Sequence, residues 1–406
     1  KGLAGRSTNV AVPTSHRGLA TFEFAAARIP CHPPRKIFNE LTIQDTKIFL
    51  RDLGMRLPWY SVLALAFLLP LSQALSNAAI VIGLVGWALR SIAQRRFKIK
   101  SPGVGCLFLL LGVAGVVSMV HSVNVLTSAD GLRKIFKAFT VFLLVSEEIR
   151  TEWHFRRFIT ALLLGATIAS VDGLFQWFMG IDPIYHIPLG SPLEGLRRMS
   201  GPYHHSNAFG LFLAFVLPLS VAMIRVGGAW RLQTLGWITS VLVAASLVLT
   251  FSRGALLGVV VALLVLMVVW RAWRWLTYGL IVGLMVIMVL PAPIKAWIHT
   301  QPSAWSVMVE SGSPEVSRPQ IWRTAKNMIT DHPWVGVGVN TFVLNYDRYR
   351  EPEEGLTNRP YAHNQYLQML AEIGIVGFAV FLLLLGAALR QVVRVSRLLK
   401  DPLRGA

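Results

Sequence analysis

The stretch LQTLGWITSVLVAASLVLTFSRGALLGVVVALLVLMVVW, residues 232–270, holds two long apolar runs with a short polar break between them. Each run, 232–251 and 254–270, is close to the roughly 20 residues that an α-helix needs to cross a bilayer. Backbone groups in lipid must satisfy one another within their own segment, so such runs form helices. The stretch therefore predicts two membrane-spanning helices joined by a tight turn.

Further apolar segments of similar length bring the expected spans to ten. They are 58–74, 76–91, 103–120, 131–148, 155–178, 206–224, 275–291 and 364–389, so that spans one to nine fall within 58–291. The first two are separated only at Ser76 and Asn77, where one bent helix is the alternative. Hydrophobic residues make up 54% of the 406 residues and charged residues only 15%, as in membrane proteins. We expect an all-α, polytopic integral membrane helical bundle of about 10–12 transmembrane helices.

The net charge of +19 comes from short Lys and Arg clusters between the apolar segments. With ten spans these clusters fall on one side, which the positive-inside rule assigns to the cytoplasm. That side holds residues 1–57, a partly disordered tail, and 398–406, after a last transmembrane region at 364–397. The other side holds the segments 121–130, 180–205 and 252–253 and a large loop at 292–363. The charge thus marks orientation, and no nucleic-acid partner is expected.

The large loop contains the pattern RPQIWRTAKNMITDHPW, residues 318–334. Its apolar residues recur at near 3.6-residue spacing, which predicts a short helix lying along the membrane surface: Ile321, Trp322, Ala325 and Met328. A loop of this length is usually functional.

Three places on the outward side carry arginines at or near expected helix starts. In TFSRGALLG, residues 250–258, Ser252 is an expected N-cap and Arg253 falls in the first turn, where a cation opposes the helix dipole by about 0.3–1 kcal/mol. A bound anion would explain this placement, and a snorkelling arginine is the alternative. Arg197 and Arg198 precede a Gly-Pro turn, and Arg318 precedes Pro319, a helix-start signature.

His363 stands at the mouth of the last apolar segment, in the stretch RPYAHNQYLQMLAEIGIVG, residues 359–377. A polar stripe follows it at helical spacing, and it must face protein or water: Asn364, Gln368 and Glu372. Beyond the stripe, Gly374 and Gly377 permit close helix approach. An imidazole at this position can accept a proton at neutral pH.

Several motifs of other chemistries are missing. We find no Asp-x-Asp pair outside the membrane, no P-loop and no Gly-x-Ser-x-Gly elbow, and the adjacent His204 and His205 have no further ligand at zinc spacing. No metal and no cofactor are therefore expected. Several arginines with one histidine base suit displacement at a carbon whose leaving group is a phosphate or diphosphate.

The motifs resemble those of a known family. His363-Asn364, nine residues, Gly374, two residues and Gly377 are similar to the signature of bacterial O-antigen ligases. SRGALLG, SRPQIWRTAKNMITDHPWVGVGVNTF and AHNQYLQMLAEIGIVG resemble, in order, blocks of the wider ligase and polymerase superfamily. The resemblance covers roughly residues 58–397.

This resemblance implies a metal-independent, inverting glycosyltransferase in the Gram-negative inner membrane, with its active site facing the periplasm. The donor would be O-antigen on undecaprenyl diphosphate, and the acceptor a sugar hydroxyl of lipid A-core. Arg253, Arg318 and Arg198 would bind the donor diphosphate, His363 would act as the base, and Asn364 and Arg197 would support them. An O-antigen polymerase, a protein-glycosylating ligase and an anion transporter are the alternatives.

Overall fold

A computed structural model describes residues 53–95, 100–189, 198–226, 228–270, 318–351 and 361–398. These residues all belong to one compact unit, residues 49–406. They are mostly α-helical, and among them the only β structure is an isolated antiparallel bridge between Ile181 and Pro188. The predicted all-α class is confirmed.

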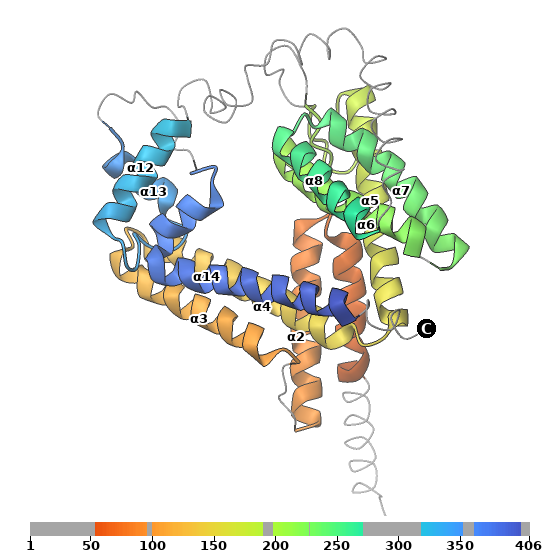
Figure 1. Ribbon diagram of the computed structural model, residues 1–406, viewed down its shortest axis with the longest axis horizontal. Helices are drawn as coiled ribbons and strands as arrows, with labels where there is room; N and C mark the ends of the chain where they lie inside the picture. The colour runs from red at the N-terminus through yellow and green to blue at the C-terminus, as the bar shows by residue number, and fades with distance from the viewer. Residues whose placement is uncertain are drawn as a thin grey trace, which may run out of the picture. The chain divides into compact units, whose positions relative to one another are not determined.

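Figure 1 shows the described helices, labelled in chain order. They are Leu53–Leu68, α2 (Gln73–Ala93), α3 (Pro102–Ser118) with the 3-10 turn η1 (Met119–His121), α4 (Val125–Glu148), α5 (Glu152–Met179), α6 (Ser206–Val226), α7 (Trp230–Leu249), α8 (Arg253–Val269), α12 (Arg318–Asp331), α13 (Phe342–Tyr349) and α14 (Gln365–Leu398).

Nine of the ten expected spans overlap these helices, and the segment 275–291 lies outside the described residues. Within the described part, six helices are long and apolar enough to cross a membrane: α2, α3 with η1, α5, α6, α7 and α14. The helices Leu53–Leu68 and α8 are apolar but shorter. The protein is therefore a multi-pass membrane protein.

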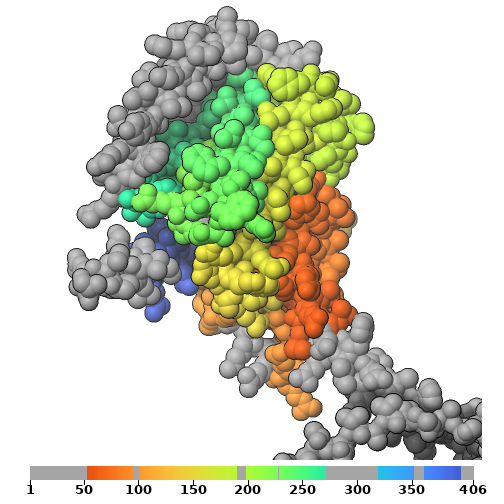
Figure 2. Space-filling view, turned by 90° about the vertical axis from the view of Figure 1, so that its right-hand side faces the viewer, coloured from red at the N-terminus to blue at the C-terminus, as the bar shows by residue number. Residues whose placement is uncertain are grey.

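The first two helices form an antiparallel hairpin. A Cβ added at Gly54 would lie 3.2 Å from the backbone nitrogen of Arg90, and one added at Gly86 would lie 2.9 Å from Cδ of Pro58. The chain must reverse between the helices to bring both pairs together, so the alternative of one bent helix is wrong. In Figure 2 the red-orange surface of this hairpin borders the yellow surface near residue 150.

The reversal lies at residues 69–72. The sequence-based prediction places it at Ser76 and Asn77 and is wrong on this point. Ser72 is the N-cap of α2, and its Oγ accepts a hydrogen bond from the backbone N–H of Leu75 at 3.4 Å. Ser76 is buried one turn inside α2. Pro70 and the capping serine are the stronger stop and start signals, because proline cannot continue a helical hydrogen-bond ladder.

Helices α5 to α8 share one apolar core. α6 packs against α7 and α8, and α7 also packs against α5. The side chains at the centre of this core are fully buried: Leu163, Phe209, Leu213, Val216 and Val243. Burial of such side chains, each contributing about 1.5–3 kcal/mol relative to exposure, holds the starts of α6 and α8 together.

A second group of helices consists of α3, α4, α12, α13 and α14. α14 packs against α3 and α12, and α3 packs against α4. The apolar stripe of α12 is buried against Phe342 and Tyr346 of α13 and Ala371 of α14. The sequence correctly predicts the helix, and its apolar face is covered by the protein itself. That the helix lies along the membrane surface stays a prediction.

Contacts form between residues at or near helix connections that the ten-span arrangement places on the same side of the membrane. On one side, Asn340 Nδ2 donates a hydrogen bond of 3.0 Å to the carbonyl of Thr127, between the predicted loops 121–130 and 292–363. On the other side, near the C-terminal ends of α2 and α4, the buried side chains of Arg90 and Glu148 form an ion pair. Which side faces the cytoplasm stays a prediction.

Candidate functional site

Arg198 and Arg253 belong to an arginine cluster that also contains Asn207 and Thr250. The Nε of Arg198 donates a hydrogen bond of 3.0 Å to the carbonyl of Thr250, and its Nη2 donates one of 2.6 Å to Oδ1 of Asn207. Arg253 is the first residue of α8, and Asn207 is the second of α6. Arg198 thus bridges the starts of two helices that are far apart in the sequence.

The chain reaches this geometry through a tight turn between α7 and α8. Thr250 is fully buried, and Phe251 has a positive φ of 50°, which a non-glycine residue rarely adopts. Ser252 is the N-cap position of α8, as predicted, although its side chain makes no capping hydrogen bond. A Cβ added at Gly210 of α6 would lie 2.8 Å from Cβ of Ser252, so only a glycine allows this approach.

The electrostatics of the cluster favour an anion. Burial lowers the pKa of the Arg198 guanidinium from its usual value, and the neighbouring charge of Arg253 lowers it further. Two like charges are therefore held close together where the N-termini of α6 and α8 also carry partial positive charge. A phosphate or diphosphate at this point would be attracted by both guanidinium groups and by free N–H groups at the helix starts.

His363 lies in a second cluster, the histidine segment, residues 361–364. Asn364 precedes α14, and its Oδ1 accepts hydrogen bonds from the N–H groups of Tyr366 at 3.0 Å and Leu367 at 3.3 Å. His363 is exposed and has a positive φ of 48°. The capping residue Asn364 and the strained backbone of His363 itself hold the imidazole at the mouth of the helix, and such strain is common at functional sites.

The histidine segment is attached to α12. Nε1 of Trp322 donates a hydrogen bond of 3.1 Å to the carbonyl of Ala362, which is fully buried beside His363. Arg318 is the first residue of α12, one turn before Trp322, as Pro319 predicts. The side chain of Arg318 and the whole of Arg197 lie outside the described residues.

The glycine pair marks a kink in α14, where Gly374 has φ 64° and ψ −174°. A Cβ at Gly374 would lie 2.3 Å from the carbonyl oxygen of Trp334. Backbone hydrogen bonds fasten residues 333–338 to the kink, including Ile375 N–H to Pro333 at 2.8 Å and Val337 N–H to Ala371 at 2.9 Å. The sequence predicts close approach at this glycine, but a loop approaches it and not a second helix.

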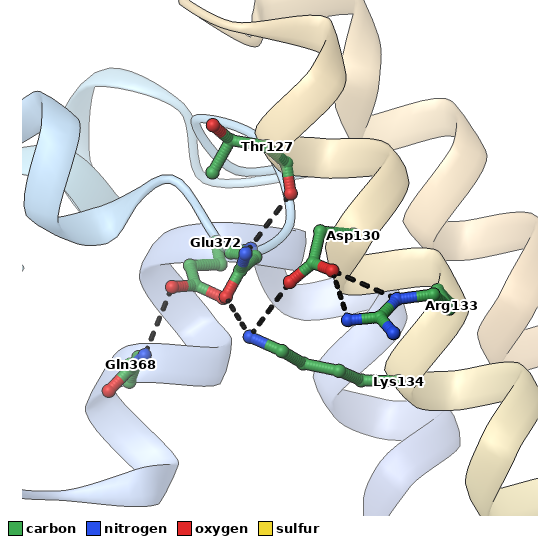
Figure 3. A network of polar contacts seen from close by, with 7 residues as sticks. Thr127, Asp130, Arg133, Lys134, Gln368 and Glu372 are labelled. Carbon is green, nitrogen blue, oxygen red and sulfur yellow. Dashed lines mark hydrogen bonds and ion pairs between the residues drawn. The ribbon is translucent and has the colours of Figure 1, made fainter. Parts of the chain in front are cut away.

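Glu372 holds the same loop from inside α14 (Figure 3). Its buried carboxylate accepts hydrogen bonds from the N–H of Asn340 at 2.7 Å, the N–H of Phe342 at 3.3 Å and Nε2 of Gln368 at 3.1 Å. The polar stripe after His363 therefore faces protein, as its spacing predicts. Lys134 of α4 joins the network through a 2.8 Å hydrogen bond from Nζ to Oδ1 of Asn340.

Sequence reasoning missed a further set of contacts at the other end of α12. Tyr349 Oη donates a hydrogen bond of 2.5 Å to Oδ2 of Asp331, which lowers the pKa of the carboxyl. Burial and this carboxylate raise the pKa of Tyr349 to about 12. The rings of His332 and His121 lie 4.3 Å apart between centroids. No motif signals these contacts, because they join segments that are far apart in the chain.

The structure brings the predicted site residues into two groups. Arg198 and Arg253 lie together at α6 and α8, and His363 lies with the start of α12 and the mouth of α14. Residues 271–317, which connect α8 to α12, lie outside the described residues, so the meeting of the two groups stays a prediction. Within the described ranges, no three His, Cys, Asp or Glu side chains are grouped as metal ligands.

Comparison with known families gives one match. A family model described as O-Antigen ligase matches residues 238–382, from α7 into α14. No curated protein and no solved structure matches the chain. The matched region contains the arginine at the start of α8, the arginine at the start of α12 and the histidine segment, in the order that the motifs predict. Residues 238–382 of this multi-pass membrane protein are therefore similar to the O-antigen ligase family.

Proposed function

We propose that the protein transfers O-antigen polysaccharide from undecaprenyl diphosphate to a sugar hydroxyl of lipid A-core, at the periplasmic face of the inner membrane. The family match and the spanning helices support a transferase that acts on lipid-linked glycans. The observation that carries the proposal is the pair of guanidinium groups, Arg198 and Arg253, held together at two helix starts.

In this reaction the acceptor hydroxyl oxygen attacks the anomeric carbon of the donor glycan. The new glycosidic bond forms as the bond between that carbon and the diphosphate oxygen breaks. The hydroxyl proton passes to the imidazole of His363, and undecaprenyl diphosphate leaves with the bonding electron pair. Attack opposite the leaving group inverts the anomeric configuration.

Arginines would stabilise the leaving group in place of a metal ion. Arg198 and Arg253 supply two guanidinium groups, and Arg318 at the start of α12 would supply a third. A guanidinium can bind two phosphate oxygens at once. It stabilises the negative charge that develops on the leaving group in the transition state more than the charge of the ground state. Electrostatic groups of this kind usually provide the largest single share of catalysis.

His363 is suited to the role of base by its surroundings. The imidazole is exposed, while Ala362 on one side is buried and Asn364 on the other caps α14. The backbone is thus fastened and the ring stays accessible to a substrate. General bases of this kind typically contribute about 10²–10⁴-fold in rate.

The test uses purified protein in nanodiscs with a carrier-linked glycan as donor. Lipid A-core is offered as acceptor in one arm, and a second carrier-linked glycan in the other. We expect transfer to lipid A-core, no added metal requirement, and loss of transfer in a folded His363→Ala variant. Arg253→Ala should weaken donor use, and Arg253→Lys should restore it only in part because lysine cannot bind in a bidentate manner.

Two results would overturn the proposal. Equal transfer by His363→Ala and the parent protein would show that His363 is not the base. Extension of the carrier-linked glycan without transfer to lipid A-core would identify a polymerase. The variant His154→Ala serves as the control and should retain activity: His154 is a partly buried histidine at the start of α5, where its ring forms a hydrogen bond with Thr151.

A further inference from the structure

The middle of α4 carries three cations on neighbouring turns, and we call Arg133, Lys134 and Lys137 the basic face. The side chains of Arg133 and Lys134 are 71% and 57% exposed. Asp130 neutralises part of this charge. Its Oδ1 lies 2.5 Å from Nη2 of Arg133, and its Oδ2 lies 3.3 Å from Nζ of Lys134. Lys137 forms no hydrogen bond or ion pair with any residue in the described ranges.

The cations lie beside apolar helices, some way along α4 from its start. α4 packs against α2 and α3, both of which are long and apolar enough to cross the membrane. Lys137 lies about 20 Å along the helix axis from the N-cap Asn124, at 1.5 Å per residue. The neighbouring Phe136 is 56% exposed, as expected of a surface in contact with lipid. α4 itself is not among the six described helices that are long and apolar enough to cross a membrane, so its cations set it apart from the helices it packs against.

A solvated or orienting role explains the basic face poorly. A solvated cationic face would carry polar side chains alone, whereas exposed Phe136 stands between Lys134 and Lys137 in the sequence. Orienting cations gather on the cytoplasmic side, whereas α4 begins beside Asn340 of the predicted outward loop. Lysine stems can lift their ammonium groups toward the headgroup level, where anionic lipid headgroups lie.

The basic face is connected to the half of the site that holds His363. Lys134 donates a hydrogen bond to Oδ1 of Asn340, and the N–H of Asn340 donates one to Glu372 of α14 (Figure 3). The arginine cluster belongs to other helices, α6 and α8. A transferase with two lipid-linked substrates needs two anionic headgroup sites, and the basic face and the arginine cluster lie on different helices.

We propose that the basic face binds the phosphorylated headgroup of the acceptor lipid, so that its sugar hydroxyl is delivered toward His363. This inference rests on the proposed function. The donor diphosphate is assigned to the arginine cluster, and the acceptor lipid is the remaining anionic substrate. The face therefore acts in acceptor recognition and not in the chemical step.

The kinetic test compares the parent protein with the double variant Arg133→Gln/Lys137→Gln in nanodiscs of neutral phospholipid. Each basic residue near a membrane surface changes lipid affinity about fivefold, so the KM for lipid A-core should rise about 25-fold while the KM for the donor is unchanged. The matched control, Arg231→Gln/Arg390→Gln, removes two exposed cations elsewhere and should leave both values within about twofold.

A binding test separates this inference from the proposed function. Lipid A-core, intact or dephosphorylated, is titrated into nanodiscs that hold the His363→Ala variant, with or without the two α4 substitutions. We expect intact lipid to bind more weakly when the substitutions are present, and dephosphorylated lipid to bind weakly to both proteins. If the parent catalyses no transfer and this pattern still holds, the lipid site stands and the proposed function fails.

Equal binding of intact lipid with and without the α4 substitutions would overturn the inference. A rise in the donor KM alone would assign the basic face to the donor diphosphate, which also contradicts it.

Discussion

Substitution of Gly374 by alanine tests how the kink of α14 is built. Gly374 has φ 64° and ψ −174°, a region that residues with a Cβ avoid at a cost of about 1–3 kcal/mol. The added Cβ would lie 2.3 Å from the carbonyl oxygen of Trp334 and 2.5 Å from the backbone nitrogen of Val335. No rotamer change relieves an overlap with backbone atoms, so residues 333–338 must move.

Movement of that loop breaks backbone hydrogen bonds. Two of the closest, Ile375 N–H to Pro333 and Val337 N–H to Ala371, contribute about 1 kcal/mol each. With the backbone strain, we expect Gly374→Ala to lower the free energy of unfolding by about 3–5 kcal/mol. The loss should appear as a lower Tm in detergent and faster hydrogen exchange at residues 333–341.

Gly386, three turns further along α14, provides the matched control. A Cβ at Gly386 would meet no atom within 4 Å. Gly386→Ala should therefore be neutral or stabilising by about 0.5–1 kcal/mol, because alanine favours helix. If Gly374→Ala kept the parent's Tm and exchange protection, as Gly386→Ala should, the kink of α14 would not depend on a glycine at residue 374.

Three further substitutions test the contacts around the site and the bundle. Trp322→Phe removes the hydrogen bond to the carbonyl of Ala362 and should cost about 1–3 kcal/mol, with faster hydrogen exchange at residues 361–364 and unchanged exchange in α6. Glu148→Gln leaves the buried guanidinium of Arg90 without its counter-ion and should lower stability by about 3–5 kcal/mol; an unchanged Tm in detergent would contradict this. Asn364→Ala removes the cap of α14 and should cost about 1 kcal/mol, whereas Asn364→Asp should restore the parent's Tm.

The helices could be predicted because lipid permits few other structures. Apolar runs of spanning length must form helices, and nine of the ten expected segments overlap described helices. The error at the first hairpin arose from weighting the polar pair Ser76-Asn77 above Pro70 and Ser72. A polar pair can be buried within a helix, as Ser76 is, whereas proline and a capping serine act on the backbone itself.

The candidate site was predictable in its residues and not in its contacts. Spacing along one helix predicts that Asn364, Gln368 and Glu372 share a face. It gives no information on the loop that Glu372 binds, because Asn340 is 32 residues away in the chain. The bridge from Arg198 to Thr250 spans 52 residues and depends on how α6 packs against α8. Contacts of this kind follow from tertiary packing alone.

The most direct measurement of the central claim is an experimental structure of the His363→Ala variant in a nanodisc with bound carrier-linked donor. We expect the diphosphate to lie within about 3 Å of the Arg253 guanidinium, as in a charge-assisted hydrogen bond. We also expect residue 363 to face the anomeric carbon from the side opposite the diphosphate. A diphosphate bound away from both arginines of the cluster, or residue 363 on the other side of the bilayer, would contradict the account.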